Sequence, residues 1–395
     1  MLPRADHGKS VAAGLCLWQS VGMMPRFSAL LAALLALALC PAYADAPADV
    51  RPGDTFAARD TLSPASDPES DAAACLQQLT WTTADFSVTC EPRHETHGDL
   101  LLRFPSALPS GHEKNDRVAL EWYQARSRDG KLLRAPAVVV VHESGKGMVA
   151  GRTFARGLRT RQFHTFLIHL PGYGARRSDW TADIRNLLPS MRQAVADVRR
   201  ARDAIAALPQ VDASLIAVQG TSLGGFVTAT VAGLDRAYQR AFILLAGGQL
   251  SEVLLHGNRD AAGMRRQLEA AGITHDQIRE LSMAIEPMRL AHRVDSSRTW
   301  LFSGKFDEVV PPRCSHAFAA AAGLAGEHHR ELPVGHYSAA LLLPVILQQI
   351  GDLIGQPAPA TPPQPAASPI PASPPSPPQT PSAGPAPGPA GSPLQ

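Results

Sequence analysis

The sequence predicts an α/β domain built on a doubly wound, mostly parallel sheet. Short, continuously apolar runs such as 137–141 and 215–218 are typical of parallel strands that are buried on both faces. Segments with the apolar spacing of helices separate these runs. Because strands that alternate with helices pair side by side in parallel, the order of these segments predicts one parallel sheet covered by helices.

The predicted elements run from residue 75 to residue 355. Three segments near the start have the composition of antiparallel strands, and five buried strands with intervening helices follow. The antiparallel strands are predicted at 86–89, 100–104 and 118–123, the parallel strands at 137–141, 163–170, 215–218, 242–245 and 299–302, and the helices at 152–161, 187–208 and 226–232. A helical insertion, 249–298, separates the last two parallel strands and is either a small cap over a site or a pair of surface helices.

The N-terminal region has the pattern of a secretory signal peptide at 24–44. Arg26 precedes a short apolar run, 27–39, which leads into the small-residue cleavage pattern Ala42-Tyr43-Ala44. Residues 1–23 do not fit such a signal and are interpreted as an upstream extension of the gene model. The pattern predicts export, to the periplasm or out of the cell.

A lipid anchor at Cys40 is the alternative to cleavage after Ala44. It is disfavoured because Leu39 stands directly before the cysteine, where a small residue is expected.

Two further segments are predicted to lie outside the folded domain. Residues 45–74 are rich in Ala, Pro, Asp and Ser without apolar periodicity and are interpreted as a linker. Residues 356–395 hold 16 of the 35 prolines and are interpreted as a disordered tail. Lys and Arg (37) nearly balance Asp and Glu (35), which argues against a nucleic-acid-binding surface.

Three cysteines follow the predicted cleavage site. Cys75 and Cys90 are close enough in sequence to close a short disulfide loop, which an oxidising compartment would allow. Cys314 would then be unpaired, and we interpret it as a small buried hydrophobic residue.

The segment Gly220-Thr221-Ser222-Leu223-Gly224 carries the predicted chemistry. This G-x-S-x-G pattern follows a buried strand and precedes a helix, the context in which a sharp turn exposes a nucleophilic serine. The glycines remove side chains that would collide across the turn. The alternative role of Ser222 is a plain helix N-cap.

A serine nucleophile requires a base, and the base requires an orienting carboxylate. Asp307 stands just past the predicted strand 299–302, at the strand end where catalytic groups gather in open α/β sheets. Glu308 is the competing carboxylate one residue later. Asp295 precedes the same strand and lies at its wrong end.

His336 is the predicted base because it stands in a loop between a possible last strand and the C-terminal helix. His316, His328 and His329 compete with it. They are predicted to lie in or at the end of a helix after Asp307, where solvation is the simpler interpretation.

An oxyanion site requires two backbone N–H donors. The N–H group of Leu223 directly follows the nucleophile. The second donor is predicted in the glycine-containing loop 142–147, with Ser144 as the choice and Glu143 as the alternative.

These motifs resemble the α/β-hydrolase superfamily, nearest to its dienelactone-hydrolase and acetyl-esterase-like branches. The resemblance spans 137–355 and is carried by the runs VVVVHESGKG, LPGYG, GTSLGG, GKFDEVVPP and GHYSA. It implies an α/β-hydrolase fold and a Ser222–Asp307–His336 triad. Two features depart from these relatives. Many of them carry His-Gly where this chain has His142-Glu143, and dienelactone hydrolases have Cys at the position of Ser222.

Other polar residues are interpreted as structural. Arg176 and Arg177 follow the LPGYG loop and are predicted to be a solvated pair rather than a substrate site. His142 and His169 end predicted strands but lack the spacing of metal ligands, so neither a metal nor a cofactor is predicted.

The sequence therefore predicts an exported serine esterase that acts on a small-molecule ester, with no nucleic acid and no stable membrane span. A peptidase or amidase on the same triad is the alternative, and the expected lack of an N-terminal propeller domain argues mildly against it. A catalytically idle binding protein of the same fold is the third hypothesis. A catalytically idle protein would be expected to lack one of the triad residues, whereas all three are present in this chain.

Overall fold

The computed structural model describes residues 48–356, and the structural statements below concern that range. The predicted signal peptide at 24–44, the segment 1–23 and the tail from 357 onward lie outside the described residues.

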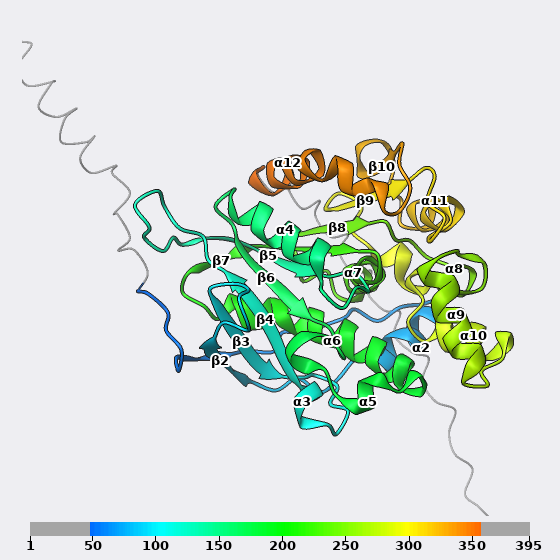
Figure 1. Ribbon diagram of the computed structural model, residues 1–395, viewed down its shortest axis with the longest axis horizontal. Helices are drawn as coiled ribbons and strands as arrows, with labels where there is room; N and C mark the ends of the chain where they lie inside the picture. The colour runs from blue at the N-terminus through cyan, green and yellow to red at the C-terminus, as the bar shows by residue number, and fades with distance from the viewer. Residues whose placement is uncertain (1–47, 357–395) are drawn as a thin grey trace, which may run out of the picture. The chain divides into compact units, whose positions relative to one another are not determined.

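A ten-stranded mixed sheet organises the fold (Figure 1). Its strand order is β1-β2-β3-β4-β6-β5-β7-β8-β9-β10. The first four strands pair antiparallel and β4 pairs antiparallel with β6, while the six strands from β5 to β10 run parallel to one another. The strands are β1 (Thr55–Ala58), β2 (Phe86–Pro92), β3 (Leu100–Pro105), β4 (Arg117–Tyr123), β5 (Ala135–Val141), β6 (His164–His169), β7 (Val211–Thr221), β8 (Arg240–Leu244), β9 (Thr299–Gly304) and β10 (His329–Leu332).

The helices connect these strands and cover both faces of the sheet. They are α2 (Ser70–Leu79), α3 (Glu113–Asp116), α4 (Val149–Arg159), α5 (Asp179–Ala182), α6 (Leu187–Ala206), α7 (Leu223–Leu234), α8 (Leu250–His256), α9 (Asp260–Ala270), α10 (His275–Met283), α11 (Pro312–Ala321) and α12 (Leu343–Gly355). Five short 3-10 helices complete the set: η1 (Gly174–Arg176), η2 (Ile184–Asn186), η3 (Pro287–Arg293), η4 (Gly326–His328) and η5 (Ser338–Leu342). This arrangement confirms the predicted doubly wound α/β class with antiparallel N-terminal strands.

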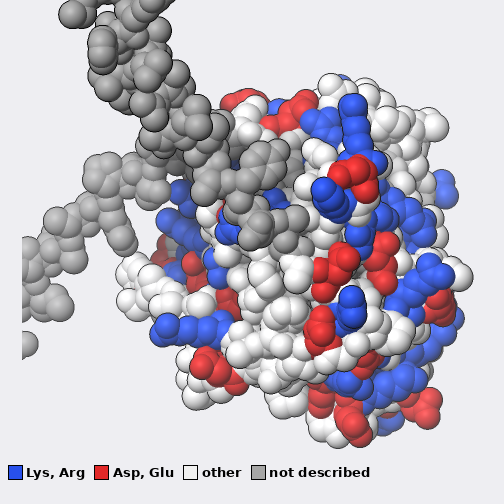
Figure 2. All heavy atoms as spheres, turned by 90° about the vertical axis from the view of Figure 1, so that its left-hand side faces the viewer, with Lys and Arg blue, Asp and Glu red and all other residues white. Residues whose placement is uncertain are grey.

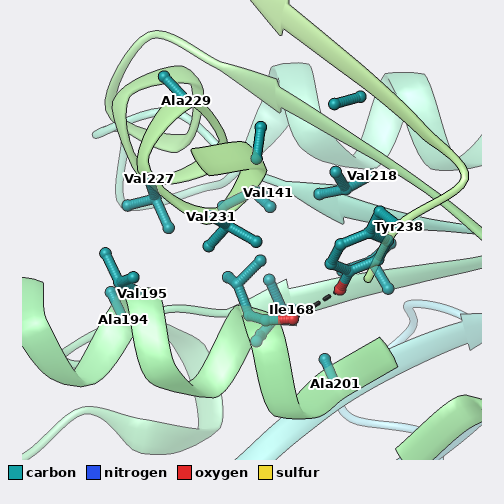
Figure 3. Close-up of a cluster of buried hydrophobic side chains, with 14 of the residues drawn as sticks. Val141, Ile168, Ala194, Val195, Ala201, Val218, Val227, Ala229, Val231 and Tyr238 are labelled. Carbon is teal, nitrogen blue, oxygen red and sulfur yellow. Dashed lines mark hydrogen bonds between the residues drawn. The ribbon is translucent and has the colours of Figure 1, made fainter. Parts of the chain in front are cut away.

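Alternate side chains of each central strand enter two different hydrophobic cores. In β5, Val139 and Val141 join the core that α6, α7 and α11 cover, whereas Val138 and Val140 join the core that α4 and α12 cover. Figure 3 shows part of the first core, where Tyr238 donates a hydrogen bond to the carbonyl oxygen of Val198 on α6 at 2.6 Å. This two-sided burial explains why the parallel strands read as continuous apolar runs.

The parallel strands all end at one edge of the sheet. The loops after β5, β7, β9 and β10 leave from this edge, because parallel neighbours point their carboxyl ends the same way. The residues singled out in the sequence after these strands are therefore brought to one side of the molecule.

The segment predicted as a linker contributes to the folded domain instead. Within it, β1 pairs with β2, and α2 begins at Ser70. Between the two, Asp60 is buried and accepts hydrogen bonds from Trp81 at 2.7 Å and from Arg200 of α6 at 2.6 Å. The segment is thus anchored by polar contacts with distant residues, which a search for apolar periodicity does not detect.

The three described cysteines are all free and buried. No Cys75–Cys90 disulfide is formed, so the pairing considered from the sequence is absent from this structure. Burial raises the pKa of Cys75 to about 11 and that of Cys90 to about 12. Cys314 is fully buried in the first core, as its interpretation as a small hydrophobic residue predicts.

Charged side chains of both signs are interspersed on the face that Figure 2 shows. One segment, Ser338–Gly355, is long and apolar enough to span a membrane by length and composition alone. It comprises η5 and α12. The buried side chains of α12, among them Ile346, Ile350 and Ile354, pack in the second core, as those of a helix covering a sheet do.

Candidate active site

Ser222 occupies the sharp turn between β7 and α7. Its backbone has φ 53° and ψ −115°, a conformation outside the regions that non-glycine residues ordinarily adopt. The turn is held on both sides: the N–H group of Ser222 donates to the carbonyl of Leu244 at 2.9 Å, and the N–H group of Phe226 donates to the carbonyl of Ser222 at 3.1 Å. Such a strained serine at a strand-to-helix turn is the geometry that the G-x-S-x-G pattern predicts.

The two glycines of the turn allow a close approach of backbone segments. A Cβ atom on Gly220 would lie 2.1 Å from the carbonyl oxygen of Gly224. A Cβ atom on Gly224 would lie 2.2 Å from the carbonyl oxygen of Val141 and 2.6 Å from that of His142. The helix that follows Ser222 therefore packs directly against the end of β5.

His336 and Asp307 complete a hydrogen-bonded chain that starts at Ser222. The Nε2 atom of His336 lies 2.9 Å from the Oγ atom of Ser222, and its Nδ1 atom lies 2.7 Å from the Oδ2 atom of Asp307. The Oδ1 atom of Asp307 accepts the N–H groups of Val309 at 2.8 Å and Val310 at 2.9 Å. Asp307 is buried, and these contacts fix its carboxylate in one orientation.

The competing acid and bases lie elsewhere. Glu308 is exposed, and its carboxylate lies 3.5 Å from Arg259. His316 contacts Glu331, His328 donates to the carbonyl of Thr299, and His329 contacts Ser303. Of the four histidines considered from the sequence, it is His336 that the structure places against Ser222.

The loop after β5 is held in place by the side chain of Glu143. Its carboxylate accepts the N–H groups of Ala150 and Gly151, both at 3.0 Å, in the first turn of α4. A carboxylate at this position is favourable because the first N–H groups of a helix lack intrahelical acceptors. The sequence predicts a role for the backbone of Glu143 alone, whereas its side-chain role is evident only in the folded structure.

His142 sets the orientation of the peptide group between Glu143 and Ser144. Its Nδ1 atom donates to the carbonyl oxygen of Glu143 at 2.6 Å, and its Nε2 atom accepts the N–H group of Leu170 at 3.2 Å. Burial lowers the pKa of His142 to about 3, so the ring is neutral at physiological pH and can both donate and accept. Because a trans peptide directs its N–H group opposite to its C=O group, the N–H group of Ser144 points away from the ring.

A buried ion pair also supports this loop. Arg152 of α4 donates to the carbonyl of Gly147 at 2.9 Å and forms a salt bridge with Glu121 of β4 at 2.6 Å. Burial alone would raise the pKa of Glu121, but hydrogen bonds from His169 and Arg152 outweigh it and hold the pKa at about 2. No local sequence signal marks this support, because its partners are 31 and 48 residues apart.

Ser222 opens into a cavity of about 380 Å³. Ser144 and His336 also line this cavity, so the loop after β5 and the His336 loop face a common space. Most of the other lining side chains are aliphatic or aromatic, and Phe154 of α4 and Phe302 of β9 are buried among them.

The helical insertion contributes one edge of the site. Asp260, at the start of α9, lines the cavity, and burial together with a hydrogen bond to Asp260 raises the pKa of Tyr337. The guanidinium of Arg259 lies 5.4 Å from the ring centre of Tyr337. The helices α8, α9 and α10 lie together beyond this edge (Figure 1) and pack around Leu255, Leu268 and Ile278. The insertion therefore reaches the cavity through Asp260, packs α8, α9 and α10 on one another, and packs η3 in the first core through Leu290.

The prediction of a solvated Arg176–Arg177 pair is wrong for Arg176. Its side chain is fully buried and forms an ion pair with Asp197 of α6 at 2.7 Å. It also donates to the carbonyls of Asn115 and His169. Arg177 is exposed, as predicted. A buried charge needs such partners, and they come from segments that the sequence does not place nearby.

Within residues 48–356 no group of three or more His, Cys, Asp or Glu side chains is arranged to hold a metal ion. His142 and His169 instead hydrogen-bond to protein atoms, with His169 donating to Glu121 and accepting from Ala175.

A family model described as the prolyl oligopeptidase family matches residues 154–334. The matched region contains the serine turn and Asp307 and ends two residues before His336. The sheet order and the serine turn are those of an α/β-hydrolase fold. With this fold and the prolyl oligopeptidase family match, the chain is a hydrolase.

Several solved α/β-hydrolase structures are similar to this hydrolase at low sequence identity. The acetyl xylan esterase from Paenibacillus sp. R4 is 19% identical, with a TM-score of 0.49 over 73% of this chain and 96% of that chain. Acetyl xylan esterase 1 from Thermoanaerobacterium sp. JW/SL YS485 is 15% identical, with a TM-score of 0.48 over 74% and 96%. A puromycin-hydrolyzing peptidase of Mycobacterium tuberculosis is 16% identical, with a TM-score of 0.49 over 69% and 46%. No curated protein sequence matches the chain.

Proposed function

We propose that this hydrolase cleaves carboxylic esters, with Ser222 as nucleophile, His336 as general base and acid, and Asp307 as the orienting carboxylate. The observation that carries the proposal is the continuous contact from the Oγ atom of Ser222 through His336 to Asp307, at 2.9 and 2.7 Å. A serine hydroxyl is a weak nucleophile at its free pKa, and a positioned base activates it.

The first half of the reaction forms an acyl-enzyme. The Nε2 atom of His336 takes the proton of Ser222 as its Oγ atom attacks the ester carbonyl. Asp307 stabilises the imidazolium that results. The same nitrogen then gives this proton to the leaving alcohol oxygen, the C–O bond breaks, and the acyl group remains on Ser222.

The second half repeats this transfer with water. His336 takes a proton from the water molecule that attacks the acyl-enzyme and returns it to the Oγ atom of Ser222. The carboxylic acid is released and the free enzyme is restored.

Two backbone N–H groups are proposed to hold the oxyanion, those of Leu223 and Ser144, with that of Glu143 as the alternative to Ser144. Leu223 is the first residue of α7, where N–H groups have no intrahelical acceptor. The hydrogen bond from His142 to the carbonyl of Glu143 supports Ser144, because it turns the N–H group of Ser144 away from the His142 ring. One such donor is worth about 10²–10³ in kcat in comparable sites.

The cavity favours esters over peptides as substrates. Each residue of a bound peptide brings an N–H and a C=O group that must find partners when buried. The wall that α4 and α12 provide consists largely of apolar side chains such as Phe154 and Ile346. Peptide or amide hydrolysis on the same triad is the second candidate, and the match to the prolyl oligopeptidase family favours it.

The first test is replacement of the proposed nucleophile. Ser222→Ala is expected to lower kcat on p-nitrophenyl acetate by about 10⁵-fold or more, because the acyl-enzyme cannot form. It should also abolish labelling by a fluorophosphonate that maps to Ser222 in the unmodified protein. The matched control is Ser214→Ala, at an exposed serine at the far end of β7, which should retain both activity and labelling.

Retention of activity by a purified, folded Ser222→Ala protein would refute the proposed nucleophile. A panel of p-nitrophenyl esters and p-nitroanilide peptides separates the two candidate substrate classes. Faster turnover of the anilides would favour the peptidase.

A further inference from the structure

We propose that the cavity beside Ser222 is an acyl-binding site, and that the substrate is an ester of a linear hydrocarbon acyl group of medium length. This inference rests on the proposed ester hydrolysis at Ser222 and names its substrate class.

Two helices on the same face of the sheet form the walls of the cavity. One wall comes from α4 through Thr153 and Phe154, and the other comes from the C-terminal segment through Ala340, Leu343 and Ile346. Both helices belong to the second core and are therefore held against the sheet. The space between the two helices is therefore fixed by the packing of the core.

The floor of the cavity is the carboxyl end of the sheet. Leu244 of β8 and Phe302 of β9 contribute buried side chains there, and Thr221 of β7 leads directly to Ser222. A substrate group that lies on this floor is thus next to the reacting serine.

The charged groups of the cavity are already engaged by the protein. The carboxylate of Glu143 accepts two N–H groups of α4, and Asp260 is hydrogen-bonded to Tyr337. The hydroxyl of Thr153 donates to the carbonyl of Val149 at 2.7 Å. The other lining side chains are mostly apolar and favour a ligand group without hydrogen-bond donors or acceptors, such as a hydrocarbon chain.

The volume of about 380 Å³ matches a medium-length chain. A water molecule occupies about 30 Å³ in the liquid, so the cavity holds on the order of ten groups of that size. An acetyl group would leave most of the apolar wall without contacts, and an octanoyl group would cover it.

The acyl side of the ester is the side that this cavity suits. After the first half-reaction the acyl group stays attached to Ser222, so its position must persist until water attacks. The alcohol must leave past His336, which gives it a proton. The side chains of α4 and of the C-terminal segment on two sides of this space can hold a group that stays attached to Ser222.

One exposed apolar side chain lines the cavity. Val149, at the start of α4, is 70% exposed. Its exposure fits a substrate whose apolar part approaches from outside.

The first measurement is kcat/KM for p-nitrophenyl esters from acetyl to decanoyl, each below its micellar concentration, with the full chain. We expect a rise of up to about fourfold per added methylene to about octanoyl, the equivalent of ~0.8 kcal/mol per buried methylene. A series of acetate esters with alcohols of increasing length should show no comparable rise.

The second measurement uses a variant whose larger side chain fills part of the cavity. Ala340→Trp places an indole at the wall and should lower the octanoyl-to-acetyl ratio of kcat/KM at least tenfold. Gln348→Trp, at an exposed position of α12, is the matched control and should keep the ratio of the unmodified protein. Circular dichroism and the thermal midpoint establish that both variants are folded.

Each outcome decides between the proposals. The acyl site is overturned if kcat/KM does not change with acyl length, or if folded Ala340→Trp keeps the octanoyl-to-acetyl ratio of the unmodified protein. In that case, labelling of Ser222 and turnover of the acetyl ester would still support ester hydrolysis. A rise with alcohol length that Ala340→Trp abolishes assigns the cavity to the alcohol and also overturns the inference. Absence of both Ser222 labelling and ester turnover overturns the proposed function and, with it, the acyl site.

Discussion

Asp307 uses both carboxylate oxygens for different tasks. Its Oδ1 atom accepts the N–H groups of Val309 and Val310, and its Oδ2 atom faces the Nδ1 atom of His336. The backbone contacts fix the carboxylate, and the carboxylate in turn fixes the tautomer of the imidazole. With the proton on Nδ1, the Nε2 atom is free to accept the proton of Ser222.

Asp307→Asn tests this orientation. The amide oxygen can keep the two backbone contacts, but the amide NH₂ group then faces His336 and favours the tautomer that carries its proton on Nε2. We expect kcat to fall by about 10⁴-fold with little change in thermal midpoint. Glu308→Gln, one residue further on and exposed, is the control and should retain activity. A larger loss in Glu308→Gln than in Asp307→Asn would contradict the assignment of the acid.

The residues of the proposed triad are readable from sequence because each stands in a local pattern after a strand. Arg176 shows the limit of such patterns. It also follows a strand and a glycine-containing loop, yet it is buried against Asp197. The sequence around Arg176 contains nothing that distinguishes a solvated arginine from one whose partner comes from a helix later in the chain.

At the scale of elements, the serine turn depends on the contact between the start of α7 and the end of β5. Gly224 lies so close to β5 that no side chain fits between them. The same contact holds the beginning of the loop that carries His142 and Glu143. The nucleophile and the proposed oxyanion loop are thus positioned by one backbone-to-backbone approach.

Gly224→Ala should destabilise the protein by about 3 kcal/mol or more, because the new Cβ atom would overlap two carbonyl oxygens of the β5 end. Urea denaturation measures this change. The matched control is Gly263→Ala in α9, where the nearest atom to a new Cβ is 3.9 Å away, on the flexible Arg266 side chain. This control should stabilise the protein by up to about 1 kcal/mol, since alanine is the better helix former. Equal effects of the two substitutions would contradict the close approach.

Elements with strong periodicity were predicted well, and weakly patterned ones were missed. The buried runs 137–141 and 299–302 lie within β5 and β9, because burial on both faces demands an apolar residue at every position. The edge strand β1 has one partner and a largely exposed sequence, so it resembles a linker. Its place is set by the pairing with β2 and by the contacts of Asp60 with α6 and Trp81.

At the scale of the whole molecule, several buried histidines make the free energy of unfolding depend on pH. His164 accepts the N–H groups of Trp122 and Ala125, and burial lowers its pKa to about 4. Burial lowers the pKa of His142 to about 3 and also lowers that of His169. Each ring is therefore neutral in the folded protein at a pH where it would be protonated in the unfolded chain.

The free energy of unfolding should fall as the pH drops below about 6.5. The folded pKa values lie below the unfolded value of about 6.5, so the unfolded state binds more protons and gains stability as acid is added. His142 and His164 together should reduce the free energy of unfolding by about 4 kcal/mol between pH 7 and pH 5. Urea denaturation at half-unit pH steps measures this slope. A free energy of unfolding that stays constant over that range would contradict the neutral, buried state of these rings.

The sequence by itself determined the class of the fold, the order of the buried strands along the chain and the residues proposed for the nucleophile, acid and base. It could do so because double-sided burial and a tight turn impose requirements on consecutive residues. Tertiary structure alone decided the polar contacts that bury Arg176 and anchor the segment before α2, the role of the Glu143 side chain and the cavity between α4 and α12. These features join residues far apart in the chain, and their energies depend on distances that exist only once the sheet has formed.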